Sequence, residues 1–272
     1  MICACIDIGS NTTRLLVADT SGGNLRELVN QRAFTRIGRS VDAGGAIPEE
    51  KISETADVVR TQAQVAREVG ATQTVAVATA AIRNAPNRDR LVQAVERAGG
   101  VELSVLSGRE EARLSFVGAT RTLLQPAVGT IAVIDVGGGS TELGIGEANG
   151  RMAWSESFRV GSGFLADAYL KSDPPAADEL LKLRRHVSGT FEGLAPPPAR
   201  SAVAVGGTAT SLRRLVGAEL AHDTLERGIR VLSTTPIQEV ASRFELDPER
   251  VRLLPAGILV LEALSDCLGL PL

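Results

Sequence analysis

The chain has 272 residues, of which 44% are hydrophobic and 22% are charged, and its 29 basic and 32 acidic residues give a formal net charge of −3. This composition is typical of a globular protein with one large or two modest domains, and it excludes a chain that is disordered throughout. A slightly acidic chain lacks the surplus of cations that sequence-independent nucleic-acid binding needs, so we expect no nucleic-acid partner.

Three further features predict a cytoplasmic protein without a membrane partner. The three cysteines make no disulfide framework. No apolar run approaches the roughly 20 residues of a membrane span. The first residues do not resemble a signal peptide, because Asp7 comes early and no basic start precedes it.

The first half of the chain predicts an antiparallel meander followed by alternating helices and strands. Apolar, partly β-branched runs predict strands over 2–8, 14–19 and 25–35. A helix is predicted from Pro48 to just before Gly70, because apolar residues recur there every three or four positions. The elements predicted next are a strand over 74–78, a helix over 88–98, a strand over 102–106 and a helix that begins near 109.

The second half repeats this pattern and then becomes mainly helical. The predicted strands are 130–136, 142–146, 152–159 and 202–205. The predicted helices are 162–170, 176–191, 208–216, two short ones after Pro236 and Pro248, and a last one over 256–268. The alternation of strands and helices predicts an α/β protein.

A sequence repeat defines the expected domains. Segment 7–15 aligns with segment 135–143, so that the Asp, the first Gly, the second Thr and the Leu match in register. Both copies join the end of one apolar strand to the next strand. We therefore expect two similar domains, one over 1–122 and one over 123–255.

The repeated glycine turns are candidate phosphate sites. Glycine allows positive φ and a close backbone approach, and successive amides in such a turn form an anion-binding nest. A single copy favours an ordinary hairpin with glycine in its turn, but two copies in register favour phosphate binding. The residues concerned are Gly9, Ser10, Asn11 and Thr12 in the first copy, and Gly137, Gly138, Gly139, Ser140 and Thr141 in the second. Asp7 and Asp135 end the strands, where a carboxylate can hold Mg²⁺.

Other candidates keep two interpretations each. Gly206 and Gly207 join a strand to a helix, as an anion or nucleotide site or as a plain turn with Thr208 as N-cap. Glu110 and Glu111 point about 100° apart on a helix, so one of the two is a candidate base for water, although acidic residues in a first helical turn also stabilise the helix. Arg83 is a phosphate clamp or a surface arginine. The two histidines have no partner motif and are expected to be surface or capping residues.

Five ordered motifs run along the chain: Ile6–Asn11, Val77–Arg83, Leu106–Leu114, Ile134–Leu143 and Leu254–Gly257. Together they resemble the exopolyphosphatase / guanosine pentaphosphate phosphohydrolase (Ppx/GppA) family. This family belongs to the actin, sugar kinase and heat-shock-70 superfamily, whose phosphate and adenosine segments the three glycine turns resemble. The resemblance implies two ribonuclease-H-like domains with a central cleft, the final helix at about 256–272 packing back onto the first domain, and a possible homodimer.

The resemblance also implies an activity and roles for individual residues. It implies Mg²⁺-dependent hydrolysis of the terminal phosphoanhydride of inorganic polyphosphate or guanosine pentaphosphate, with Glu111 as the base. Asp135 and Glu142 are associated with metal and water. The phosphate-binding positions of the family fall on Asn11, Arg83, Gly137, Gly138 and Ser140.

Long members of the family carry additional C-terminal helical domains, whereas this chain stops before such a region. We therefore expect a short-form enzyme that acts on short-chain polyphosphate. Two alternatives remain open. One is an ATP-dependent kinase or ATPase of the same superfamily, and the other is a non-catalytic sensor that binds polyphosphate or (p)ppGpp.

Overall fold

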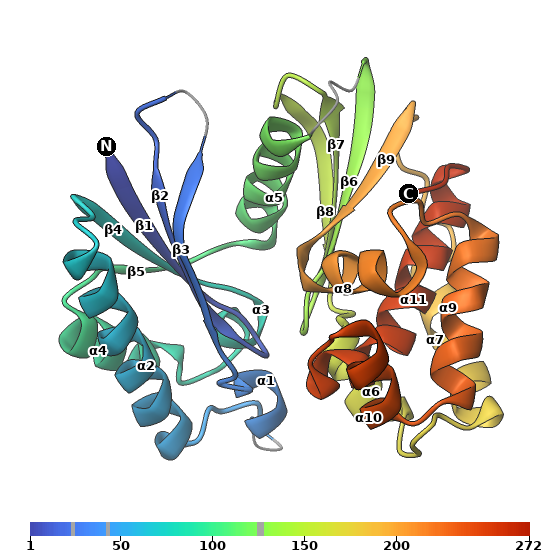
Figure 1. The fold of residues 1–272 in the computed structure, drawn as a ribbon, viewed down its shortest axis with the longest axis horizontal. Helices are drawn as coiled ribbons and strands as arrows, with labels where there is room; N and C mark the ends of the chain where they lie inside the picture. The colour runs from blue at the N-terminus through green and yellow to red at the C-terminus, as the bar shows by residue number, and fades with distance from the viewer. Residues whose placement is uncertain (23–24, 42–43, 124–127) are drawn as a thin grey trace. The chain divides into compact units, whose positions relative to one another are not determined.

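Strands and helices alternate in two units of the computed structural model, which describes residues 1–22, 25–41, 44–123 and 128–272. The first unit is Met1–Ser107 and the second is Gly108–Leu272 (Figure 1). The boundary therefore precedes helix α5 (Gly108–Thr122), whereas the sequence placed it after this helix. The final helix is also part of the second unit and not of the first. In both cases the apolar face of the helix packs against apolar residues of the second unit.

The first unit is a five-stranded sheet with helices. Its strands, in the order β3-β2-β1-β4-β5, are β1 (Ile2–Ile8), β2 (Thr13–Asp19), β3 (Arg26–Ala33), β4 (Gln73–Ala78) and β5 (Leu103–Val105). Its helices are α1 (Ile37–Ser40), α2 (Glu49–Glu68), α3 (Ala80–Arg83) and α4 (Arg88–Gly99). β1 to β3 form the expected antiparallel meander, and β4 and β5 continue the sheet in parallel.

The second unit is a four-stranded sheet in the order β8-β7-β6-β9. Its strands are β6 (Thr130–Val136), β7 (Thr141–Glu147), β8 (Met152–Phe158) and β9 (Ser201–Val205). Its further helices are α6 (Ser162–Tyr169), α7 (Ala177–Phe191), α8 (Gly206–Val216), α9 (His222–Thr234), α10 (Ile237–Phe244) and α11 (Pro248–Leu268). Helix α5 covers one face of the sheet, where Ile131 and Val133 pack with Phe116. The large core on the opposite face includes Ile134, Val136 and the later helices (Figure 1).

The structure confirms the repeat and the ribonuclease-H-like arrangement. In each unit an antiparallel meander is followed by a strand that pairs in parallel with the first strand of the meander. The two turns also have the same hydrogen bond: the amide of Gly9 donates to Thr12 O at 2.9 Å, and that of Gly137 donates to Ser140 O at 3.0 Å. The matching residues of the sequence therefore form matching hairpins.

The helices at the end of the chain differ from the prediction. Helix α11 continues through Pro255, which the sequence took as a helix boundary, because its middle turns are buried on all sides and offset the roughly 3 kcal/mol that an internal proline costs. Helix α9 was missed, since Gly228 weakens its helical signal. A methyl group at Gly228 would lie 3.0 Å from Cδ1 of Ile258, so alanine there would require this side chain to shift. Within the described ranges, none of the helices combines the length and the apolar run of a membrane span.

Candidate active site

Two carboxylates face each other across the second hairpin. Asp135 of β6 is paired with Glu142 of β7 in the antiparallel register, so their side chains share one face of the sheet. Alternation along β6 places Asp135 on the face of Ile131 and Val133, which helix α5 covers. The hairpin that the sequence singled out therefore carries two acidic groups toward α5.

Helix α5 adds a third carboxylate and a hydroxyl to the same place. Glu111 and Ser115 are four residues apart and therefore share one side of the helix. The hydroxyl of Ser115 donates to Oδ2 of Asp135 at 2.6 Å, and the negative charge of Glu111 acts on Glu142. Gly144 allows this close packing, since a methyl group there would lie 3.3 Å from the ring of Phe116.

The environment raises the pKa of two of these carboxyl groups. Glu142 is only 2% exposed, and burial, together with the charges of Glu111 and Asp135, raises its pKa to about 8. Hydrogen bonds from Ser140 and from Ser157 of β8, the latter at 2.7 Å, favour the ionised form and oppose this rise. Burial likewise raises the pKa of Asp135, against the hydrogen bond from Ser115. Such a carboxylate cluster gains from a cation or a proton.

Glu142 should make folding stability depend on pH. Between the ordinary pKa of 4.5 and about 8, the folded protein holds the proton that the unfolded chain has released. The free energy of unfolding therefore falls as pH rises through this window. In EDTA, we expect the free energy of unfolding of Glu142→Gln, relative to that of the wild type, to rise by a few kcal/mol between pH 5 and pH 9. Urea unfolding measures this difference. A difference that stays constant with pH would contradict this, and Glu147→Gln, at the exposed end of β7, is the control.

The glycine turn next to these carboxylates presents backbone amides. The amide of Ser162 donates to Gly137 O at 2.9 Å, and that of Gly163 donates to Gly138 O at 3.0 Å. Because the N–H of a trans peptide points opposite to its C=O, the amides of Gly138 and Gly139 point away from α6. No hydrogen bond among the described residues uses either amide. The turn can therefore donate two hydrogen bonds to an anion.

The first turn of α8 completes this part of the site. Gly206 has a φ of 82°, and a methyl group on it would collide with Oδ1 of Asp135. The guanidinium of Arg250 lies against Gly207. Thr208 is not the expected N-cap, because α8 begins at Gly206 and the Thr208 hydroxyl donates to Val136 O at 3.0 Å.

One expected hydroxyl donor is directed elsewhere. The side chain of Thr141 is fully buried, and its hydroxyl donates to Val160 O at 2.5 Å. Alternation along β7 turns Thr141 away from the face that carries Glu142. Contrary to expectation, this hydroxyl is unavailable to a phosphate.

The first unit holds the other predicted residues. The turn of Gly9, Ser10, Asn11 and Thr12 is braced by two amides, since Arg36 N donates to Asn11 O and Gly38 N donates to Ser10 O. The Nδ2 of Asn11 is buried and has no hydrogen-bond partner among the residues that the structure describes.

Arg83 and Asp7 also lie in the first unit. Arg83 ends α3, and its Nη1 donates to Leu106 O at 2.9 Å. Asp7 is paired with Arg14, where the second hairpin pairs two acids. The two hairpins thus share a backbone but differ in charge.

The second unit therefore brings together Glu111, Asp135, Glu142, Gly137, Gly138, Gly139, Ser140, Gly206 and Gly207. Sequence reasoning missed Ser115, Ser157 and Arg250. The spacing of Ser115 from Glu111 was an available signal, because residues four apart share a helix face. Ser157 depends on the strand register and Arg250 on the packing of α11, and neither has a local signal in the sequence.

Comparisons with known proteins agree with this architecture. The chain is 31% identical to exopolyphosphatase 2 of Mycobacterium tuberculosis over 96% of its own length and 89% of that protein. It is 28% identical to the guanosine-5'-triphosphate,3'-diphosphate pyrophosphatase of Aeromonas hydrophila subsp. hydrophila, over 98% of its own length and 55% of that protein. It thus spans about half of this longer relative.

A solved structure and a family model extend the match. The crystal structure of the Ppx/GppA family member of Aquifex aeolicus is 26% identical, with a TM-score of 0.82 over 99% of this chain and 91% of that one. The model of the Ppx/GppA phosphatase family matches residues 16–270. A match of this extent, on a chain with the duplicated hairpin and the acidic helix α5, shows that the protein belongs to the Ppx/GppA phosphatase family.

Proposed function

We propose that this protein hydrolyses the terminal phosphoanhydride of inorganic polyphosphate, with a preference for short chains, or of guanosine pentaphosphate. The observation that carries the proposal is the grouping of Glu111, Asp135 and Glu142 next to the amides of the second glycine turn. The names of the exopolyphosphatase and pyrophosphatase relatives support this class of substrate.

The proposed reaction is an in-line attack of water on the terminal phosphoryl group. Glu111 orients the water and accepts its proton, which is the role of a general base. The amides of Gly138 and Gly139 and the first turn of α8 donate hydrogen bonds to phosphate oxygens, where charge develops. In the first unit, Asn11 and Arg83 are proposed as phosphate-binding residues in their own right. Support for Asn11 comes from its buried Nδ2, which has no hydrogen-bond partner among the described residues.

The acidic residues suit Mg²⁺. Carboxylate oxygens are the protein ligands that this ion prefers, and it commonly uses one or two of them together with phosphate oxygens. A cation would also stabilise the ionised form of Glu142, whose pKa is raised by burial and by the charges of Glu111 and Asp135. We propose Asp135 and Glu142 as the holding residues, and Asp7 is a weaker candidate because Arg14 faces it. When bound, the ion would neutralise charge on the phosphates.

A substrate panel tests the activity. Phosphate release is measured from triphosphate, long polyphosphate, guanosine pentaphosphate and ATP, each with Mg²⁺ and with EDTA. We expect turnover of triphosphate or guanosine pentaphosphate with Mg²⁺ and its loss in EDTA. Faster turnover of ATP than of the others would instead indicate an ATPase or kinase. Binding without phosphate release at any Mg²⁺ concentration would indicate a sensor.

A pair of glycine variants tests whether the position of Asp135 matters for activity. Gly206→Ala and Gly217→Ala both force alanine into positive φ, 82° and 107°, and each should cost about 1–3 kcal/mol of stability. Only Gly206→Ala pushes on Asp135, because nothing lies within 4 Å of a methyl group at Gly217. We expect phosphate release to fall by about tenfold or more in Gly206→Ala alone. Equal activity of the two folded variants would contradict a role for Asp135.

A further inference from the structure

We propose that the second unit carries a binding site for a divalent transition-metal ion of the zinc class, formed by His222, Glu226 and Glu262. The site lies among helices α7, α9 and α11, on the face of the sheet opposite to α5 (Figure 1). It is independent of the proposed hydrolysis and uses none of the residues assigned to it.

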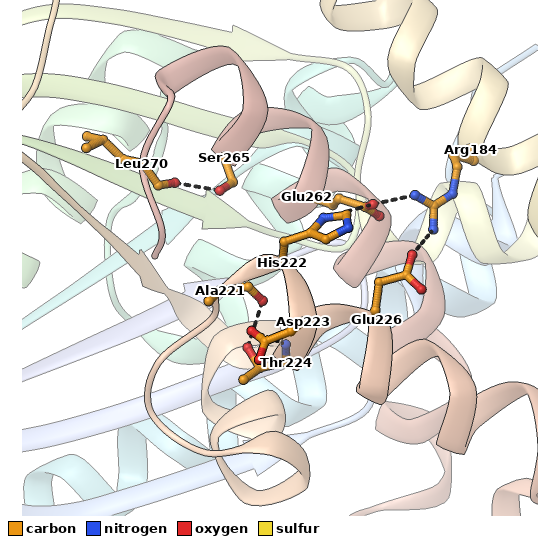
Figure 2. A network of polar contacts seen from close by, with 9 residues as sticks. All are labelled: Arg184, Ala221, His222, Asp223, Thr224, Glu226, Glu262, Ser265 and Leu270. Atoms are coloured by element: carbon orange, nitrogen blue, oxygen red, sulfur yellow. Dashed lines mark hydrogen bonds and ion pairs between the residues drawn. The ribbon is translucent and has the colours of Figure 1, made fainter.

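Three ligand groups converge from two helices. His222 and Glu226 are one turn apart on α9, so they share a face, and Glu262 approaches from α11 (Figure 2). One ligand atom from each of the three lies within 4.8 Å of the other two. Among the residues that the structure describes, this is the one group of three histidine, cysteine or acidic side chains with that spacing.

Glu262 is a buried carboxylate, and its negative charge is stabilised by a cation nearby. Glu262 is 7% exposed, on a stretch of α11 that is otherwise apolar and buried. A buried carboxylate is costly unless a cation balances it. Arg184 of α7 does so here: its Nη1 bonds to Glu262, and its Nη2 lies 3.3 Å from Glu226 (Figure 2). Nδ1 of His222 lies 3.8 Å from Oε1 of Glu262, the oxygen that Arg184 also contacts.

A divalent ion can replace Arg184. The two carboxylates and Arg184 sum to one negative charge, whereas the two carboxylates and a divalent ion sum to zero. Arg184 can move out, because its side chain is 39% exposed and a guanidinium is well solvated at a surface. His222 is 70% exposed, so the ion has access from solvent. One imidazole, two carboxylates and a water make the four-coordinate set that Zn²⁺ accepts, whereas Mg²⁺ disfavours the imidazole.

Neighbouring contacts fix the two helices before any ion binds. The backbone of Leu220, just before α9, pairs with Leu272 in both directions at 2.8 and 3.4 Å. The hydroxyl of Thr224 donates to Ala221 O, and that of Ser265 donates to Leu270 O (Figure 2). The start of α9 and the end of α11 are thus tied together, which reduces the ordering cost of binding.

The experiment titrates Zn²⁺ by calorimetry and Co²⁺ by visible absorption into the full chain, with thiols kept reduced. Three variants are compared: His222→Ala, Arg184→Gln and, as the matched control, His186→Ala, which changes the other, also exposed histidine of the chain. Circular dichroism checks that each variant is folded.

We expect one equivalent of metal to bind the wild type and His186→Ala alike. His222→Ala should weaken binding by about tenfold or more. Arg184→Gln should tighten it several-fold, since it removes the competing cation. A purely structural ion-pair network predicts the opposite, because Arg184→Gln would then lower stability without any gain in metal affinity.

Three results would overturn the proposal. The first is unchanged binding in His222→Ala, and the second is an affinity in Arg184→Gln that is no higher than in the wild type. The third is a thiolate charge-transfer band with Co²⁺, which would assign the ion to the cysteines. Mg²⁺-supported phosphate release by His222→Ala is measured alongside, and we expect it to equal that of the wild type, so this proposal and the proposed hydrolysis can fail separately.

Discussion

Glu111→Gln is expected to lower the rate of phosphate release from triphosphate by about 10²–10⁴-fold, the usual contribution of a general base. Glutamine keeps the size of the side chain but cannot accept the proton of the attacking water. Because Glu111 also raises the pKa of Glu142, its removal should leave Glu142 easier to ionise. The loss should therefore appear in kcat, with the Mg²⁺ requirement kept.

The matched control is Glu110→Gln, the neighbouring exposed residue of the same helical turn. Successive helical residues point about 100° apart, so this change should keep most of the activity. The measurement is the initial rate of phosphate release under saturating substrate. More than about a tenth of the wild-type kcat in Glu111→Gln would argue against the role of base. Equal losses in both variants would indicate disruption of the helix.

Gly161→Ala is expected to distort the backbone of the second glycine turn, against which Gly161 packs. A methyl group at this residue would lie 2.5 Å from the carbonyl carbon and oxygen of Gly138 and from the amide nitrogen of Gly139. Backbone atoms cannot rotate aside, so the turn itself must move. We expect a loss of about 1–3 kcal/mol in the free energy of unfolding. Displacing the two amides by an ångström should also lower kcat/KM for triphosphate by about 10²-fold.

Gly189→Ala is the control for adding a methyl group. Gly189 lies within α7, with nothing within 4 Å of the added carbon. Alanine should stabilise this helix by about 0.5–1 kcal/mol. Urea unfolding and steady-state kinetics measure both variants. Wild-type kcat/KM and stability in Gly161→Ala would contradict the close packing of α6 on the turn.

Much of the fold could be predicted because its signals are local. The strands of both meanders and the helices α2, α4 and α7 follow from apolar periodicity and from glycine or proline at their ends. The short helices α1 and α3 and helix α9 could not, because few residues or an internal glycine leave little helical preference. Pro255 misled the prediction, since burial of its surroundings outweighs the local cost of proline in α11.

By itself, the sequence determined the two hairpins and the acidic helix of this protein, since a turn and a helix face depend on neighbours in the chain. Only the tertiary structure decided which carboxylates act on one another. The packing of α5 on β7 and β8 brings Glu111 to Glu142, and Ser115 to Asp135. The meeting of α9 with α11 brings His222 to Glu262. Contacts between residues distant in the chain depend on how whole elements bury their apolar faces, and no short stretch of sequence records that.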